Sequence, residues 1–269
     1  MAEAHLAAAP RRGAELGTDG PQPSRGKTEV RLLSELDDLT EAVEVIKGVW
    51  GKTGGGLLPV ELLRAYAHAG DPVLGAFQVD SGRMIGICVG FLAMPEQGDL
   101  HLHSHMTGVT PGIQHRGIGF ALKVAQREWC LERGITDVRW TVDPLLAANA
   151  WFNIGKLGGT AHSYLPQFYG DMDDDLNRGE QTDRLEMSWA VGSPRVAAIL
   201  GGQSLNGDSA KAERTVGIPA DYYGLRKTDP EEAARQRASV RSQLMEAFDD
   251  GLEISGYTRE TGYQLTRRV

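Results

Sequence analysis

One stretch of the sequence decides the fold: Val109-Thr110-Pro111-Gly112-Ile113-Gln114-His115-Arg116-Gly117-Ile118-Gly119-Phe120. An apolar strand ends where the stretch begins, and a helix starts at its far end. Backbone amides and the dipole at the start of a helix form a site for an anion such as a phosphate. Gly117 and Gly119 let the backbone approach a ligand where a Cβ atom would clash, and Arg116 could add a charge-assisted contact. Taken alone, the same spacing also fits an ordinary turn.

Two other phosphate-binding motifs do not fit. A dinucleotide-binding fingerprint needs a third glycine three residues after Gly119, and that position is Leu122. A Walker A loop ending at Gly51-Lys52-Thr53 needs an upstream glycine where the chain has Ile46. Neither motif explains the two glycines.

The elements around this stretch are typical of an α/β protein with a mixed sheet and helices on both faces. Periodicity, capping residues and turn residues predict, in chain order, a strand at 29–33, helices at 37–50 and 59–67, strands at 73–79, 84–94 and 100–109, a helix at 118–132, a strand at 138–142, a helix at 147–157, and strand-like runs at 164–169 and 185–191.

The 269 residues divide into four segments. Residues 1–28 lack periodicity and are expected to form a disordered tail, whereas 29–191 hold the elements above. Residues 192–217, which are rich in Gly, Ser and Ala with scattered charge, are expected to be a linker or loop. Residues 218–269 form an extension docked on the core, with a helix that starts at Asp229-Pro230 and two short strands after it.

Composition and charge exclude several classes of protein. The formal net charge of −8 and the pI near 5.4 argue against a nucleic-acid binder, which usually carries a basic face. The longest apolar stretches, such as Met84 to Met94, are too short to span a membrane. No apolar segment of a signal peptide follows Arg11-Arg12, and Cys88 and Cys130 cannot form a disulfide framework. We therefore expect a cytoplasmic protein.

The motif Gln114-x-x-Gly117-x-Gly119, three residues after Pro111, resembles the acyl-CoA pyrophosphate loop of the GNAT superfamily of N-acyltransferases. The order of elements over residues 29–191 agrees, and Lys156-Leu157-Gly158 is similar to the close of the family's fourth helix. The resemblance implies an α/β (α+β) fold, with a mixed, mostly antiparallel central sheet flanked by helices and a C-terminal extension of a helix plus strands. The start of that extension, at Ile218-Pro219, is similar to a larger-bodied subgroup, some of whose members are thought to acylate amino acids, including with succinyl groups.

The resemblance also implies which residues would bind the co-substrate, acetyl-CoA or another acyl-CoA. The CoA pyrophosphate would be held by the backbone of Gln114, His115, Arg116, Gly117, Ile118, Gly119 and Phe120. The pantetheine arm would pair with the strand end at Thr107, Gly108 and Val109, where a break from the next strand leaves backbone groups free. The Val109 amide would polarise the thioester carbonyl as an oxyanion-hole donor, and Asn149 would lie against the pantetheine.

The sequence departs from the family at the usual general acid. Relatives carry a tyrosine two residues before the Lys-Leu-Gly triplet, and this chain has Ile154 there. If an acid is used, Tyr164 or Tyr169 is the candidate, the alternative being an aromatic ring that packs over the sheet.

Three histidines, His101, His103 and His105, alternate along one strand and therefore face one side of it. Same-face neighbours lie about 7 Å apart, so three in a row cannot all reach one zinc ion at about 2 Å, and no metal is expected. His105, nearest the thioester, is the candidate general base that deprotonates the acceptor amine, and a polar lining of the cleft is the alternative.

These observations predict an acyl-CoA-dependent N-acyltransferase. It would transfer an acetyl or other short acyl group, such as succinyl, to a small-molecule amine by direct attack, an amino acid being one candidate acceptor. No nucleic-acid or membrane partner is expected, and a homodimer is left open. The alternative, which the loss of the tyrosine at Ile154 sustains, is a non-catalytic GNAT-fold protein that binds acyl-CoA as a sensor or assembly module.

Overall fold

A computed structural model describes most of the chain, namely the backbone of residues 4–5 and residues 27–51, 58–96, 98–114, 116–172, 181–203 and 212–268. The strands in this part are β1 (Ala4–His5), β2 (Thr28–Leu32), β3 (Val73–Gln78), β4 (Met84–Ala93), β5 (His101–Val109), β6 (Asp137–Val142), β7 (Thr160–Leu165), β8 (Arg184–Ala190), β9 (Arg214–Val216), β10 (Leu252–Thr258) and β11 (Gly262–Arg267). The helices are α1 (Leu36–Trp50), α2 (Val60–Ala69), α3 (Ile118–Glu132), α4 (Ala147–Ala150), the π-helix η1 (Trp151–Lys156), α5 (Pro194–Leu200), α6 (Tyr222–Thr228) and α7 (Pro230–Asp249).

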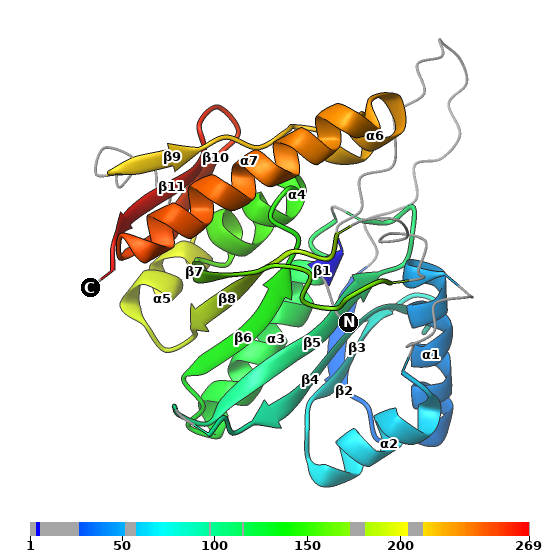
Figure 1. Ribbon diagram of the computed structural model, residues 1–269. Helices are drawn as coiled ribbons and strands as arrows, with labels where there is room; N and C mark the ends of the chain where they lie inside the picture. The colour runs from blue at the N-terminus through cyan, green and yellow to red at the C-terminus, as the bar shows by residue number, and fades with distance from the viewer. Residues whose placement is uncertain are drawn as a thin grey trace.

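All these strands belong to one sheet in the order β2-β3-β4-β5-β6-β8-β7-β10-β11-β9, and β1 pairs with β5 outside this order (Figure 1). Neighbouring strands are antiparallel except at β5–β6 and β1–β5, which are parallel. The mixed, mostly antiparallel sheet with flanking helices confirms the fold class that the sequence predicts.

Strand β5 contains a bulge at His105. Met106 pairs with Val89 and Ser104 pairs with Gly90, so His105 has no partner of its own on β4. A bulge shifts the alternation of side chains by one residue. Ser104 therefore faces α3, where it accepts a hydrogen bond from Lys123, whereas Met106 packs with the residues of α1 on the opposite face.

The ladder between β5 and β6 is short. It holds only the pairs Leu102–Val138 and His103–Arg139, and beyond His103 the two strands separate. Within the described residues it is β1 that pairs with the end of β5, Ala4 opposite Thr107 and His5 opposite Gly108 (Figure 1).

Two apolar clusters fix the helices on either face of this half of the sheet. Leu39 and Ile46 of α1 pack with Ile87 of β4 in one cluster. Ile118 and Leu122 of α3 pack with other side chains of β3, β4 and β5 in a second. Helix α3 has the predicted bounds because its apolar spacing and the glycine loop before it are both local signals.

Two predicted elements need correction. The fourth helix, predicted at 147–157, is a short α-helix that continues as η1, in which the amide of Leu157 donates to the carbonyl of Phe152. The strand-like run at 164–169 is β7, which begins and ends several residues earlier. Tyr169 therefore lies in the turn after the strand and not on it.

The linker predicted at 192–217 is also wrong in part, because the segment contains α5 and β9. The Ser193 hydroxyl caps α5 by accepting from the amide of Val196 at 3.2 Å, and Pro194 occupies the first turn. Strand β9 is only three residues long and pairs with β11, so local periodicity does not reveal it. The rest of that segment, 204–211, and most of the predicted tail at 1–28 lie outside the described residues.

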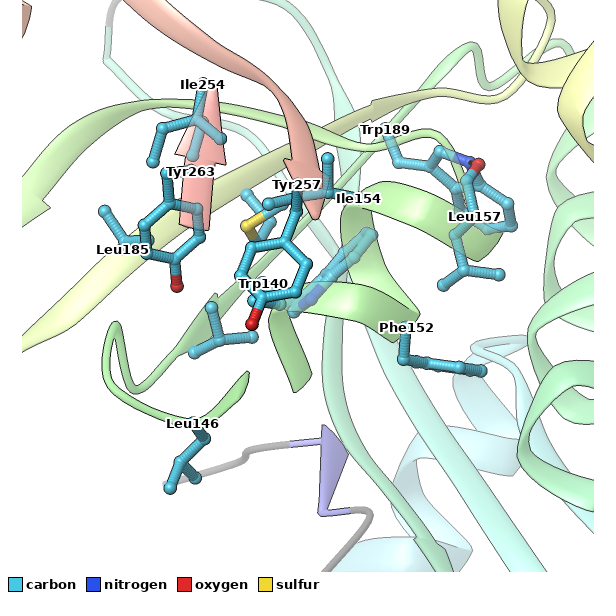
Figure 2. Packing of buried hydrophobic residues seen from close by; sticks show 14 of the residues in the cluster. Trp140, Leu146, Phe152, Ile154, Leu157, Leu185, Trp189, Ile254, Tyr257 and Tyr263 are labelled. Atoms are coloured by element: carbon cyan, nitrogen blue, oxygen red, sulfur yellow. Dashed lines mark hydrogen bonds between the residues drawn. The ribbon is translucent and has the colours of Figure 1, made fainter. Parts of the chain in front are cut away.

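The C-terminal extension continues the sheet instead of only covering it. Ile254 of β10 pairs with Ala161 of β7, and β11 and β9 add two further strands. Figure 2 shows Tyr257 and Tyr263 of this hairpin packed among the core side chains Trp140 and Leu185. The hairpin is therefore part of the same hydrophobic core as β6 and β8.

Candidate functional site

The start of α3 has backbone donors that no other group in the helix uses. Gly117 is the N-cap, with φ +86° in the left-handed region that favours glycine, and its carbonyl accepts the first helical bond, from Ala121. The amides of Ile118, Gly119 and Phe120 precede that bond and have no intrahelical acceptor. No side chain caps this end and no acid lies in its first turn. The site is therefore suited to an anion from outside the helix.

A cavity of about 210 Å³ opens directly at this helix end. Its lining residues are Val109, Gly117, Ile118, Gly119, Phe120, Ala148, Trp151, Phe152, Lys156 and Arg259. A Cβ atom built on Gly119 would lie 3.8 Å from Val109 and 3.9 Å from Phe152, both of which line the cavity. The absent side chain of Gly119 thus leaves space on the cavity side of the helix.

The end of β5 supplies two more amides on this side. The amide of Thr110, directly after β5, donates to the carbonyl of Ile85 on β4 at 3.0 Å, so Thr110 and Ile85 form a hydrogen-bonded pair. Bonding alternates along an antiparallel strand, which turns the amides of Val109 and Thr107 away from β4 and toward the gap facing β6. This is the orientation that an oxyanion-hole donor at Val109 requires.

The other predicted residues of the loop have different surroundings. The side-chain oxygen of Gln114 accepts from the amide of Gly112 at 2.8 Å, so this side chain stabilises its own loop. Arg116 is exposed beside the helix end, and His115 lies outside the described residues. At Gly108 a Cβ atom would lie 2.5 Å from the Trp50 ring, so packing against α1 explains that glycine without any ligand.

Asn149 has an unused donor. The residue is almost completely buried, and within the described chain its side-chain nitrogen has no acceptor. Its backbone carbonyl accepts from the side chain of Asn153 at 2.8 Å. A buried amide nitrogen without a partner carries a desolvation cost that a bound ligand would remove. Ala148, the neighbour of Asn149 in the chain, lines the cavity, whereas Asn149 itself is not among the lining residues.

His105 lies in the bulge and is half-buried. Its ring centroid is 5.6 Å from that of Phe91 and 6.0 Å from that of His103. Burial, together with the neighbouring His103, lowers the pKa of His105 to about 3. The imidazole is therefore unprotonated at neutral pH.

Tyr169 reaches the same face of the sheet. Its hydroxyl lies 2.8 Å from that of Thr141 on β6. Thr141 lies two residues from Arg139, which pairs with His103, so alternation places Thr141 on the face of β6 that continues the histidine face of β5. The structure thus brings Tyr169 and His105 to one face, on either side of the gap between β5 and β6.

Two other candidate positions are structural. The Tyr164 hydroxyl donates to Asp183 at 2.7 Å, and burial raises its pKa, so its proton is held in the core. Ile154, at the family's usual tyrosine position, is 1% exposed and packs with Trp140 and Tyr257 (Figure 2). Neither residue can exchange a proton with a ligand in the cavity.

Five residues that line the cavity are not among the site residues predicted from the sequence, namely Ala148, Trp151, Phe152, Lys156 and Arg259. In the sequence, Lys156 stands out only as part of the Lys156-Leu157-Gly158 motif. Arg259 lies in the turn between β10 and β11, and only the pairing of β10 with β7 brings it to the cavity.

Among the described residues, no group of three or more His, Cys, Asp or Glu side chains is arranged to hold a metal ion. None of the helices in the described part of the chain is both long enough and apolar enough to span a membrane.

No protein family model matches the sequence, and no curated protein matches it. Solved structures are similar to it. A chain of the NatC complex bound to Gag peptide and CoA aligns with a TM-score of 0.50 and 13% identity, over 61% of this chain and 98% of that one. The acetyltransferase of the GNAT family from Streptococcus pneumoniae aligns with a TM-score of 0.45 and 18% identity, over 60% and 98%. The ribosomal-protein-S18-alanine N-acetyltransferase from Escherichia coli gives 0.48 and 16%, over 62% and 96%.

At these identities the similarity shows the fold alone. The chain has the fold of this NatC-complex chain, and that fold agrees with the one that the resemblance of the loop from Gln114 to Gly119 implies.

Proposed function

We propose that the protein is an acyl-CoA-dependent N-acyltransferase that transfers an acetyl or other short acyl group, such as succinyl, to a small-molecule amine. The observation that carries the proposal is the uncapped start of α3, which faces a cavity at the end of the splayed strand β5. Helix amides without a cap bind phosphates, and the edge of β5 that separates from β6 can pair with an amide-containing arm once β1 is displaced.

The residues of this chain then have distinct roles. Acyl-CoA supplies the activated thioester. The amides of Ile118 to Phe120 bind the pyrophosphate, and the Val109 amide donates to the thioester carbonyl oxygen, where negative charge develops during attack. Asn149 donates to the pantetheine from the side of α4.

Proton transfer falls to the two residues on the histidine face. His105 is unprotonated at neutral pH and has a lone pair to accept the proton that the attacking amine loses, although its lowered pKa makes it a weaker base than an ordinary histidine. Tyr169 donates a proton to the departing thiolate from the other side of the gap. Because the amine attacks the thioester directly, no residue of the chain forms a covalent intermediate.

One observation favours a second function. Ile154 is buried where GNAT relatives carry their usual acid, so a protein that binds acyl-CoA without turnover, as a sensor or assembly module, is the competing proposal. Thiol release from acetyl-CoA and succinyl-CoA against a panel of amines, amino acids included, distinguishes the two. Release that depends on the amine supports the enzyme. Binding of acyl-CoA with no release on any amine supports the binding module.

A further inference from the structure

One wall of the cavity at α3 is formed by Trp151, Lys156 and Arg259, the last of which belongs to the C-terminal extension. Of the ten lining residues two are cations, Lys156 at the end of η1 and Arg259 in the β10–β11 turn, and none is a carboxylate. The chain as a whole carries a net charge of −8, so this wall is locally opposite in sign. Neither charged group has a hydrogen-bond or ion-pair partner among the described residues.

The turn that carries Arg259 is held in one conformation. Thr258 pairs with Gly262, whose φ of +77° closes the turn, and the amide of Thr261 donates to the Thr258 hydroxyl at 3.0 Å. A Cβ atom on Gly262 would clash with the backbone at Val216, so β9 packs directly against this turn. Because the backbone is already ordered, binding would need to fix only the Arg259 side chain.

Trp151 completes the wall with an apolar surface. Its side chain is 40% exposed although it lines the cavity. A Cβ atom on Gly155 would lie 2.6 Å from the Trp151 ring, so the ring lies against the bare backbone of η1. Exposed aromatic rings beside cations are the features on which nucleotide bases stack.

We propose that Arg259 and Lys156 bind a phosphate in the nucleotide half of acyl-CoA, so that the C-terminal extension completes the co-substrate site. The inference rests on the proposed function. The phosphate is either the ribose 3′-phosphate or the pyrophosphate. Both are anions that a guanidinium binds by charge-assisted hydrogen bonds.

The test is calorimetric titration of CoA and of 3′-dephospho-CoA into the full chain and its Arg259→Gln and Lys156→Gln variants, at one fixed ionic strength. The control is Lys227→Gln, which removes the same charge from the last turn of α6, in the same extension but outside the cavity. We expect Arg259→Gln to weaken CoA binding about tenfold and Lys156→Gln somewhat less, with Lys227→Gln unchanged.

The two nucleotides identify the phosphate. If Arg259→Gln weakens CoA but not dephospho-CoA, the contact is to the 3′-phosphate, and if it weakens both equally, the contact is to the pyrophosphate. The inference is overturned if Arg259→Gln leaves both affinities unchanged, or if Lys227→Gln weakens them as much. Failure of the proposed function is distinguishable, because then the unmodified chain itself binds no CoA.

Discussion

The guanidinium of Arg237 on α7 lies 2.8 Å from the carboxylate of Asp143, directly after β6, and both side chains are buried. The same carboxylate accepts from the amide of Leu145 at 2.8 Å, and Arg237 also donates to the Tyr222 hydroxyl. This ion pair ties the C-terminal extension to the end of strand β6. Because the pair is buried, removing either charge leaves the other as an unpaired charge in the core.

We expect Arg237→Met to lower the free energy of unfolding by about 3 kcal/mol, because Asp143 is left as a buried charge. Urea unfolding measures this loss. The double variant Arg237→Met with Asp143→Leu removes both charges and should recover part of it. A single variant as stable as the unmodified chain would show that the extension does not depend on this pair.

Lys123 on α3 gives a prediction of pH dependence. Its ammonium is fully buried, donates to Ser104 and Gln126, and lies 4.0 Å from the centre of the Trp140 ring. Burial lowers its pKa from 10.5 to about 8. Between these values the unfolded chain binds more protons than the folded chain, so the contribution of Lys123 to stability rises with pH.

The free energy of unfolding of Lys123→Met is compared with that of the unmodified chain from pH 7.5 to 9.5. The variant should lose about 2 kcal/mol of unfolding free energy relative to the unmodified chain across this range. Taking the difference between the two chains cancels the titrating groups that do not interact with Lys123. A difference that stays constant with pH would mean that Lys123 keeps an ordinary pKa.

Strand β1 pairs with the part of β5 to which we assign the pantetheine arm. Strand β1 and the pantetheine arm cannot both pair with the backbone of Thr107 and Gly108 at the same time. We expect a chain that starts at Lys27 to bind CoA about fivefold more tightly, because no strand has to be displaced. Calorimetry measures the affinity, and an Ala4→Pro variant of the full chain should shift it in the same direction. Equal or weaker binding by the shortened chain would refute the competition.

The proposed base should leave a characteristic pH profile. A group with a pKa of about 3 stays unprotonated throughout pH 5–9, so His105→Gln should lower kcat by a similar factor across that range, on the order of 10²-fold. His103→Gln, on the same face, is the matched control and should have a smaller effect. An acid limb near pH 6.5 that disappears in His105→Gln would contradict the lowered pKa.

Local signals predicted the parts of the site that lie within one continuous stretch. The bounds of α3 and the donor-rich loop at Gly117 follow from spacing and glycine placement alone. The bulge at His105 depends on the register between β4 and β5, and the position of Arg259 depends on β10 joining β7. Such cross-strand relationships join residues far apart in the chain, so no local periodicity reveals them.

The central claim, that acyl-CoA binds at the start of α3, is tested most directly at Gly119. Gly117 is less suitable, because its positive φ makes any side chain strained. At Gly119 a Cβ atom meets only ordinary contacts, and glutamate in the first turn of a helix is favourable to the helix dipole. The Gly119→Glu variant should therefore fold, while its carboxylate repels a phosphate, and Gly119→Gln controls for size.

The measurement is calorimetric titration of acetyl-CoA into the unmodified chain and these two variants, with thermal unfolding to check that each is folded. We predict binding of one acetyl-CoA per chain, no detectable binding by folded Gly119→Glu, and weakened binding by Gly119→Gln. Acetyl-CoA binding of equal affinity in all three proteins, or no binding by the unmodified chain, would contradict the account.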